Sequence, residues 1–244
     1  GRIYRIAPRG FSTPATPNLS ELTTLQLVLL LDHTNGWHRD TASRLIYQRQ
    51  DSSAITSLRQ LVKQGETAAG RFTALYTLQG LGALDESSVL AALIDSDAIV
   101  RVHALRVAEA LVAQSVAISN RFSNMTTDRD IQVRYQLAFS LGAAQGKNRY
   151  QALTRLALSD HQDKWMPVAI SSSLFQGAGF VFRELTTHAA FLKTTTGQQF
   201  MLTLATQIGA RQRADELAAV LQSLSSIKNH DATLAPKGME ALVK

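Results

Sequence analysis

The sequence contains no cysteine among its 244 residues. This absence excludes a disulfide framework, a zinc site built from cysteine, a thiol nucleophile and covalently attached c-type haem within these residues. It does not indicate a compartment, because a chain without cysteine is stable in oxidising and in reducing surroundings alike.

Long apolar runs are also missing. Apolar runs such as LVLLL at residues 27–31 are much shorter than the ~20 residues that a helix needs to span a bilayer. We therefore expect no membrane span. The first residues, GRIYRIAPRG, lack the apolar core of a signal peptide. The strand-like start and the helix-like end, GMEALVK, indicate a piece of a longer protein.

Charge of one sign is not concentrated anywhere in the chain. Apolar residues make up 45% and charged residues 18%, which is typical of a folded protein and excludes a disordered one. The formal net charge of +6 permits contact with nucleic acid, an acidic membrane surface or an acidic protein. Because Lys and Arg are scattered singly, the pattern argues against a dedicated nucleic-acid binder.

Motifs that carry chemistry are absent too. The six histidines show none of the spacings HxH, HxxxH or HExxH that local metal sites use. There is no GxSxG nucleophile elbow, and the carboxylates form no paired acid–base motif. We therefore predict no catalytic residue, no metal site and no cofactor, and we expect that this segment is not an enzyme.

What the sequence does contain is a repeat of about 32 residues. Small or apolar residues recur three and seven positions after a column of arginines, and these offsets place them on one helical face. Shorter apolar-periodic stretches and turns rich in Asp, Ser, Gly or Asn separate the copies. The arginines follow one another at spacings of 32, 30 and 33 residues: Arg39, Arg71, Arg101 and Arg134.

The repeat predicts an all-α fold of about six helix pairs, with a further first helix at 214–227. Because one such pair cannot bury its own apolar face, neighbouring pairs are expected to stack into a right-handed α-solenoid. We assign residues 18–228 to this solenoid. Residues 1–17 are expected to be a short strand-like N-terminal extension, and residues 229–244 a C-terminal tail that begins another helix.

Two segments carry the whole repeat pattern, DSDAIVRVHAL (95–105) and DRDIQVRYQLA (128–138). Both resemble HEAT repeats. The resemblance implies a ladder in which turn aspartates bond to second-helix arginines between adjacent units. The matching positions pair Asp95 or Asp97 with Arg101, and Asp130 with Arg134. The full set predicted for the ladder is Arg39, Asp40, Arg71, Asp95, Asp97, Arg101, Asp130 and Arg134.

The first half of the chain resembles a particular bacterial family. GRIYRIAP, then NGWHRDTASRLIYQR, then RFTALYTLQGLGALD follow one order. They are similar to the middle of the membrane-associated dehydrogenase-like proteins that are common in planctomycetes and related phyla. In that family a propeller resembling quinoprotein glucose dehydrogenase precedes HEAT repeats, and a cytochrome c domain usually follows. The resemblance implies that Arg2–Ile6 is the last propeller strand and that the protein is extracytoplasmic.

That resemblance covers residues 1–112 well and the rest only as degenerate helical repeats. The family pattern around NGWHRD has a second tryptophan where this chain has His38. The family's catalytic and cofactor residues would lie in the propeller and the cytochrome. None of them can be carried over to this chain.

The cluster Trp37-His38-Arg39-Asp40 allows two interpretations. It could bind a ligand at a helix N-terminus, which favours anions. Alternatively, Trp37 packs across a repeat junction while Arg39 and Asp40 join the ladder. We favour the second, because aromatic residues at helix starts are commonly packing elements.

More informative are the second-helix positions that point away from the apolar face. Arginine and aromatic residues there are typical of a protein-interaction hot spot, although the aromatic ones could equally pack between units. The candidate partner contacts on this concave face are Arg44, Tyr76, His103, Arg106, Gln136 and Phe139.

The leading hypothesis is a non-catalytic, monomeric scaffold that docks other domains of its own polypeptide or a partner protein. One alternative is a HEAT-like DNA glycosylase, but Trp37 and Trp165 fall in units too far apart to flank one catalytic aspartate. Another is a helical repeat that handles haem or another small molecule, for which His103 would be the best candidate ligand.

Overall fold

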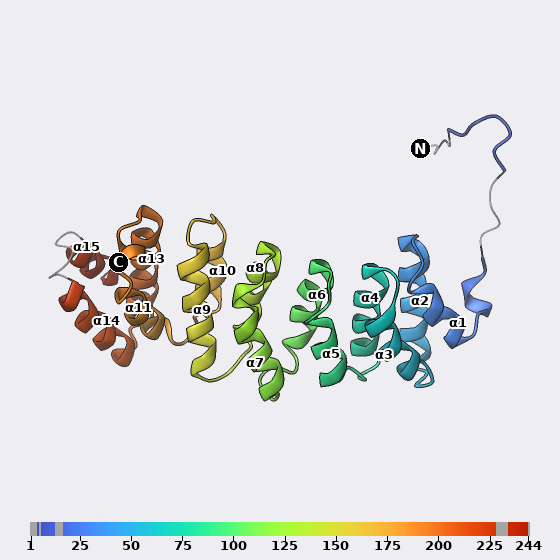
Figure 1. Cartoon of the computed structure of the whole chain (residues 1–244), viewed down its shortest axis with the longest axis horizontal. Coiled ribbons are helices and arrows are strands. Elements are labelled where there is room, and N and C mark those ends of the chain that lie inside the picture. Colours follow the sequence, from blue (N-terminus) through green and yellow to red (C-terminus); the bar gives the residue numbers. More distant parts are fainter. Residues whose placement is uncertain (1–3, 5, 13–16, 228–233, 244) are drawn as a thin grey trace.

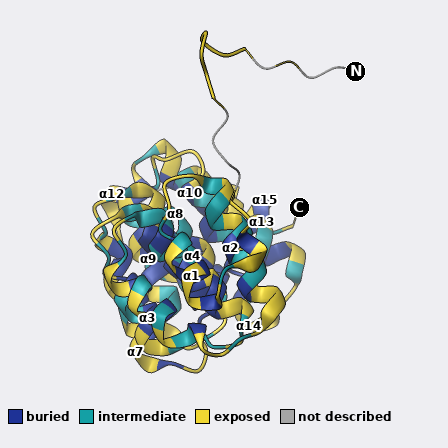
Figure 2. Ribbon diagram, turned by 90° about the vertical axis from the view of Figure 1, so that its right-hand side faces the viewer, coloured by how far each residue is buried: buried dark blue, intermediate teal, exposed yellow. Residues whose placement is uncertain are grey.

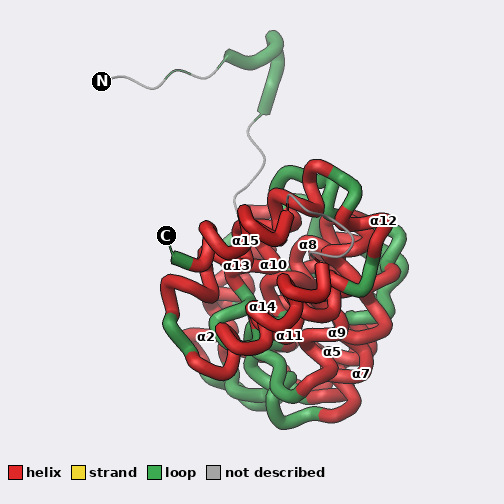
Figure 3. Tube along the Cα trace, turned by 90° about the vertical axis from the view of Figure 1, so that its left-hand side faces the viewer, coloured by secondary structure: helices red, strands yellow, loops and turns green. Residues whose placement is uncertain are grey.

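The computed structural model describes residues 4, 6–12, 17–227 and 234–243, and these residues form helices and loops without a strand (Figure 3). The chain is all-α. Two short 3-10 helices, Leu19–Glu21 and Met125–Thr127, accompany the α-helices. The α-helices described are α1 (Thr24–Leu30), α2 (Gly36–Arg49), α3 (Ala54–Gln64), α4 (Ala68–Gly80), α5 (Glu86–Ala92), α6 (Ala98–Ala108), α7 (Val116–Asn124), α8 (Ile131–Ser140), α9 (Lys147–Asp160), α10 (Met166–Ser172), α11 (Ala178–Thr186), α12 (Ala189–Leu192), α13 (Thr195–Arg211), α14 (Ala214–Ile227) and α15 (Leu234–Leu242).

The helices follow one another along an elongated row (Figure 1). Most of them pack against the helix two places further on, and several also pack against the next helix in the chain. One set contains α1, α3, α5, α7, α9, α11 and α14, each in contact with the next. We call these the first helices. In the other set α2, α4, α6, α8 and α10 pack in the same way, and α13 packs on α15. We call these the second helices. Viewed along the row, buried residues lie between the two sets and exposed residues outside them (Figure 2).

Side-chain caps determine where the second helices begin. An oxygen of Asn35, Asp97 or Asp130 accepts a hydrogen bond from the backbone N–H two residues further on. Thr67 caps α4 in the same way, through the N–H of Gly70. Each bond satisfies a donor that the helix itself leaves without a partner. Four helices therefore start at the same point of the repeat.

The apolar columns three and seven residues after the repeated arginines form the core, in agreement with the periodicity. All eight of these side chains are at most 1% exposed: Ala42, Ile46, Ala74, Leu78, Ala104, Ala108, Leu137 and Leu141.

The two ends of the chain, where the sequence predicts a strand-like extension and the start of a further helix, lie partly outside the described residues. The predicted strand Arg2–Ile6 lies mostly outside them; its described members, Tyr4 and Ile6, are exposed and not in a strand. Residues 228–233 also lie outside. The predicted tail 229–244 contains α15, which packs on α13 and α14. Small residues allow this close approach, since a Cβ on Gly238 would lie 2.7 Å from a side-chain carbon of Leu224.

Candidate functional site

Three ion pairs of the same geometry join consecutive units. Arg101 Nε and Nη2 each donate to one carboxylate oxygen of Asp128, both at 2.8 Å. Arg71 makes the same two bonds with Asp95, at 2.6 and 2.9 Å, and Arg134 makes them with Asp160, both at 2.7 Å. Paired hydrogen bonds of this kind fix orientation as well as distance. These three pairs form the arginine ladder.

Each ladder arginine also holds its own turn. Nη1 of Arg101 donates to the backbone carbonyls of Asp95 and Ser96, six and five residues earlier. Arg71 and Arg134 make the equivalent bonds to carbonyls of their own turns. One guanidinium therefore connects the turn of its own unit to the carboxylate of the next.

The ladder is shielded from solvent, and this shifts the acid–base equilibria of its members. The side chains of Arg101 and Asp128 are only 8% and 11% exposed. Burial alone would raise the pKa of Asp128, but hydrogen bonds from Arg101 and from the N–H of Asp130 outweigh burial and lower that pKa. The hydrogen bond with Asp128 raises the pKa of Arg101 in turn. Both groups are therefore charged at neutral pH.

The pairs differ from those that the sequence analysis assigned. Arg101 was expected to meet Asp95 or Asp97, and Arg134 to meet Asp130. The structure pairs them with Asp128 and Asp160 of the following unit instead. Asp97 and Asp130 cap their own helices, so their carboxylates already accept bonds at the helix start.

The cluster Trp37–Asp40 does not take part in the ladder. Arg39 donates to the carbonyls of His33 and Thr34 in its own turn. Asp40 is exposed, and neither Arg39 nor Asp40 forms an ion pair within the described residues. Trp37 was expected to pack across a junction. Instead it is 53% exposed, with its ring edge-on to His38 of its own helix.

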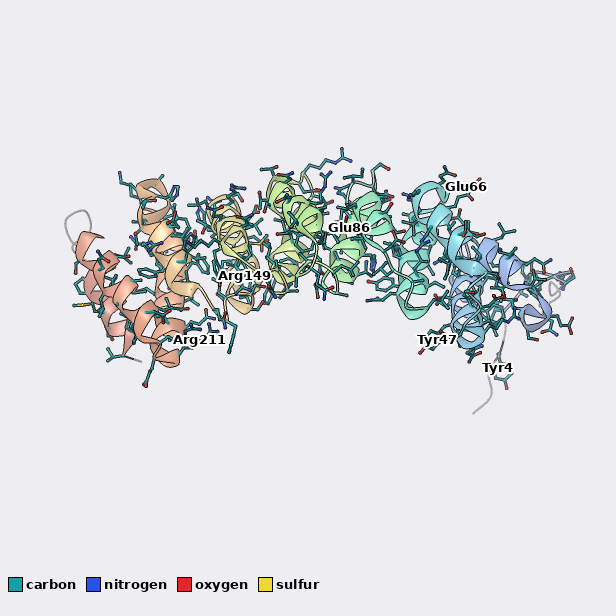
Figure 4. All side chains as sticks on the ribbon, turned by 90° about the horizontal axis from the view of Figure 1, so that it is seen from below. Tyr4, Tyr47, Glu66, Glu86, Arg149 and Arg211 are labelled. Atoms are coloured by element: carbon teal, nitrogen blue, oxygen red, sulfur yellow. The ribbon has the colours of Figure 1, made fainter. Side chains whose placement is uncertain are left out.

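The six candidate contact residues lie on the side of the second helices that faces away from the core. Seen from below, the row of helices is bowed. Tyr47 of α2 and Arg211 of α13, both on second helices, lie on its inner side, opposite Glu66 (Figure 4). Arg44 and Arg106 are exposed, and Tyr76 and Phe139 are 36% and 38% exposed. We call this surface, formed by the outward residues of α2, α4, α6 and α8, the second-helix face.

Aromatic side chains of α4 and α6 meet on this face. The oxygen of Tyr76 and Nδ1 of His103 lie 2.9 Å apart and share a hydrogen bond. Phe72 stacks on the His103 ring at a centroid distance of 4.2 Å. Burial lowers the pKa of His103, and the positive charge of Arg106 lowers it further. His103 is therefore neutral at pH 7 and forms part of a half-buried aromatic cluster.

A polar network follows on α6 and α8. Arg106 Nε donates to the side-chain oxygen of Gln136 at 2.8 Å. The hydroxyl of Ser140 donates to the carboxylate of Glu109 at 2.6 Å, and Gln136 donates to the hydroxyl of Ser140 at 3.2 Å. The network holds Arg106 and Gln136 in one place while much of the Arg106 side chain stays in solvent.

Phe72, Tyr135 and Tyr47 belong to the same face, although the offsets of two and five that predict the stripe do not include them. Tyr135 meets Phe139 edge-on at 5.0 Å, and Tyr47 lies over Gly80 of the next unit, where a Cβ would come within 3.0 Å of its ring. A helical wheel that included the offsets of one and eight from the arginine column would have found them. The face is therefore more aromatic than the predicted stripe.

Replacing Arg106 with Gln should raise the pKa of His103, because it removes a nearby positive charge that disfavours the imidazolium. The pKa should remain below the ordinary histidine value, since burial is the larger cause and persists. An NMR titration of the imidazole protons measures the shift. Arg44→Gln is the matched control, and an equal shift in that variant would contradict the assignment.

No protein-family model matches the chain, and no curated protein is similar to it. The described residues contain no group of three or more metal-ligating side chains. Within the same part of the chain, no helix has the length and apolar character needed to cross a membrane.

Proposed function

We propose that the chain is a HEAT-like α-solenoid that acts as a non-catalytic scaffold, docking a protein through its second-helix face. The packing of each helix on the one two places further along supports a stack of equivalent units. The arginine ladder supports it as well, since it repeats the same contact between units at three successive junctions.

The observation that carries the docking role is the composition of the second-helix face. Surfaces that bind proteins are enriched in aromatic residues and arginine. This face exposes Tyr47, Tyr76 and Phe139 together with Arg44 and Arg106. Cross-unit contacts such as Tyr76–His103 fix several of these side chains, so less conformational entropy would be lost on binding.

Photo-crosslinking tests the proposal. A benzoylphenylalanine placed at position 76 or 139 should crosslink the full chain to a defined partner or to a neighbouring domain. The same group at position 116, on the exposed side of the first helix α7, is the control. Equal crosslinking from both faces would exclude docking through the second-helix face. The double variant Arg44→Ala with Arg106→Ala should then weaken the captured partner's binding about tenfold or more.

Binding to duplex DNA distinguishes this proposal from a nucleic-acid function. A scaffold should bind DNA weakly. An enzyme that contacts several phosphates should bind tightly and lose affinity steeply between about 50 and about 200 mM salt. Tight, salt-dependent binding together with release of a base would rule out the scaffold.

A further inference from the structure

A groove of about 420 Å³ lies between two neighbouring units, beside the arginine ladder. The turn between α5 and α6 forms one side, and the end of α7 with the following turn forms the other. Its charged lining includes Asp95, Arg101, Arg121, Asp128 and Arg129. We call it the α5–α7 groove.

Three of these five charged groups are engaged in the ladder. Asp95 accepts from Arg71, and Arg101 is paired with Asp128. Arg121 and Arg129 remain. Neither forms an ion pair with any described carboxylate. Arg129 makes one long hydrogen bond, 3.4 Å, to the carbonyl of Ser96. The groove therefore presents two guanidinium groups whose donors are largely available to a ligand.

Apolar side chains adjoin these arginines. Leu93 and Met125 line the groove but are themselves buried, whereas Ile94, which also lines it, is 59% exposed. A ligand that fits must therefore combine an anionic group with an apolar one. The stacking of the helices does not itself require an exposed apolar side chain next to an unpaired positive charge.

The equivalent groove two units earlier supports the view that the stacking does not require these arginines. It lies between α1 and α3, has a volume of about 640 Å³ and is lined by Gln60, Gln64 and Glu66 without any arginine or lysine. Glu66 and Arg129 occupy the same position of the repeat, five residues before a ladder arginine. The same architecture thus tolerates opposite charge at this position, and the arginines of the α5–α7 groove are not needed for folding.

We propose that the α5–α7 groove binds a peptide segment of a partner protein that carries a glutamate or aspartate next to an aliphatic residue. The carboxylate would accept hydrogen bonds from Arg121 and Arg129, and the aliphatic side chain would cover Ile94. A carboxylate suits the groove better than a phosphate does, because the carboxylates of Asp95 and Asp128 at its wall oppose a second negative charge. The site lies where the first helices α5 and α7 end and the following turns begin, and it shares no residue with the second-helix face.

An NMR titration of the ¹⁵N-labelled chain tests the proposal with an acetylated, amidated peptide of alternating glutamate and leucine. We expect shifts of the amides of Asn124 and Thr127, which line the groove. A peptide with glutamine in place of glutamate should bind about tenfold more weakly. The double variant Arg121→Gln with Arg129→Gln should weaken binding of the glutamate peptide to the same extent, and Lys replacements should keep part of the affinity.

The control variant, Lys63→Gln with Lys147→Gln, removes the same charge outside the groove. Equal weakening in the control would show a non-specific effect of net charge and overturn the proposal. Equal affinity for the glutamine peptide and the glutamate peptide would also overturn the proposal. Inorganic phosphate that shifts the same amides at a lower concentration than the glutamate peptide would identify a phosphate site instead. Circular dichroism confirms folding, and the single Arg129→Gln variant, at an exposed position, serves if the double variant unfolds.

Discussion

Replacing Arg101 with Ala should lower the free energy of unfolding by about 3 kcal/mol, the cost expected when one partner of a buried ion pair is removed. The change leaves the carboxylate of Asp128 shielded from water without its guanidinium. It also leaves the carbonyls of Asp95 and Ser96 without their donor. In the proposed solenoid each unit is stabilised mainly by its neighbours, so the damage should centre on α6 and α8, the helices that the Arg101–Asp128 pair holds together. Urea unfolding gives the midpoint, and amide exchange gives the location.

Arg39→Ala is the matched control for this prediction. Arg39 occupies the same repeat position and donates to the equivalent carbonyls, those of His33 and Thr34, but no described carboxylate pairs with it. Removing the Arg39 side chain should lower the free energy of unfolding by less than about 1 kcal/mol. If the two variants are equally destabilised, the ion pair is not the source of the effect. In the double variant Arg101→Ala with Asp128→Ala, the decrease in the free energy of unfolding should be smaller than the sum of the decreases in the two single variants.

The ladder also shows what the sequence could and could not predict. The arginine column was visible because one residue type recurs at a nearly constant spacing. The partner was not, since the turns before Arg101 and Arg134 each offer two aspartates, six and four residues before that arginine, as in Asp95 and Asp97. The later one caps its own helix. Only the earlier one is left to accept from the previous unit, and this distinction requires the cap to be recognised first.

Surface roles were harder to predict than core positions. Apolar periodicity identifies the buried side of a helix, because the side that a residue occupies follows from its angular position around the helix axis. Whether an outward aromatic residue is free depends on its neighbour in the next unit. Tyr76 is restrained by His103 of the next unit, whereas the ring contact that Trp37 makes within the described residues is with His38 of its own helix. Such cross-unit contacts depend on how far one pair is rotated against the next, which a single sequence does not record.

Gly70→Ala should destabilise the protein by about 2–3 kcal/mol, although alanine favours a helix over glycine by about 1 kcal/mol. A Cβ at position 70 would lie 2.9 Å from the Cα of Asp32 and still closer to its carboxylate oxygen. That carboxylate accepts from the N–H of Glu66 at 2.7 Å and from the N–H and hydroxyl of Thr67 at 2.9 and 2.5 Å. The methyl group must displace Asp32 and so weaken three hydrogen bonds between the first two units.

Gly36→Ala provides the comparison, because position 36 is also in the first turn of a second helix. There a Cβ would meet only the flexible end of Arg39, at 3.4 Å. This variant should be as stable as the parent chain or slightly more stable. In an Asp32→Ala background the Gly70→Ala change should cost less, since the carboxylate that the methyl group displaces is gone. Thermal unfolding of the four variants and the parent measures these differences. A Gly70→Ala protein as stable as Gly36→Ala would mean that Asp32 does not hold the start of α4.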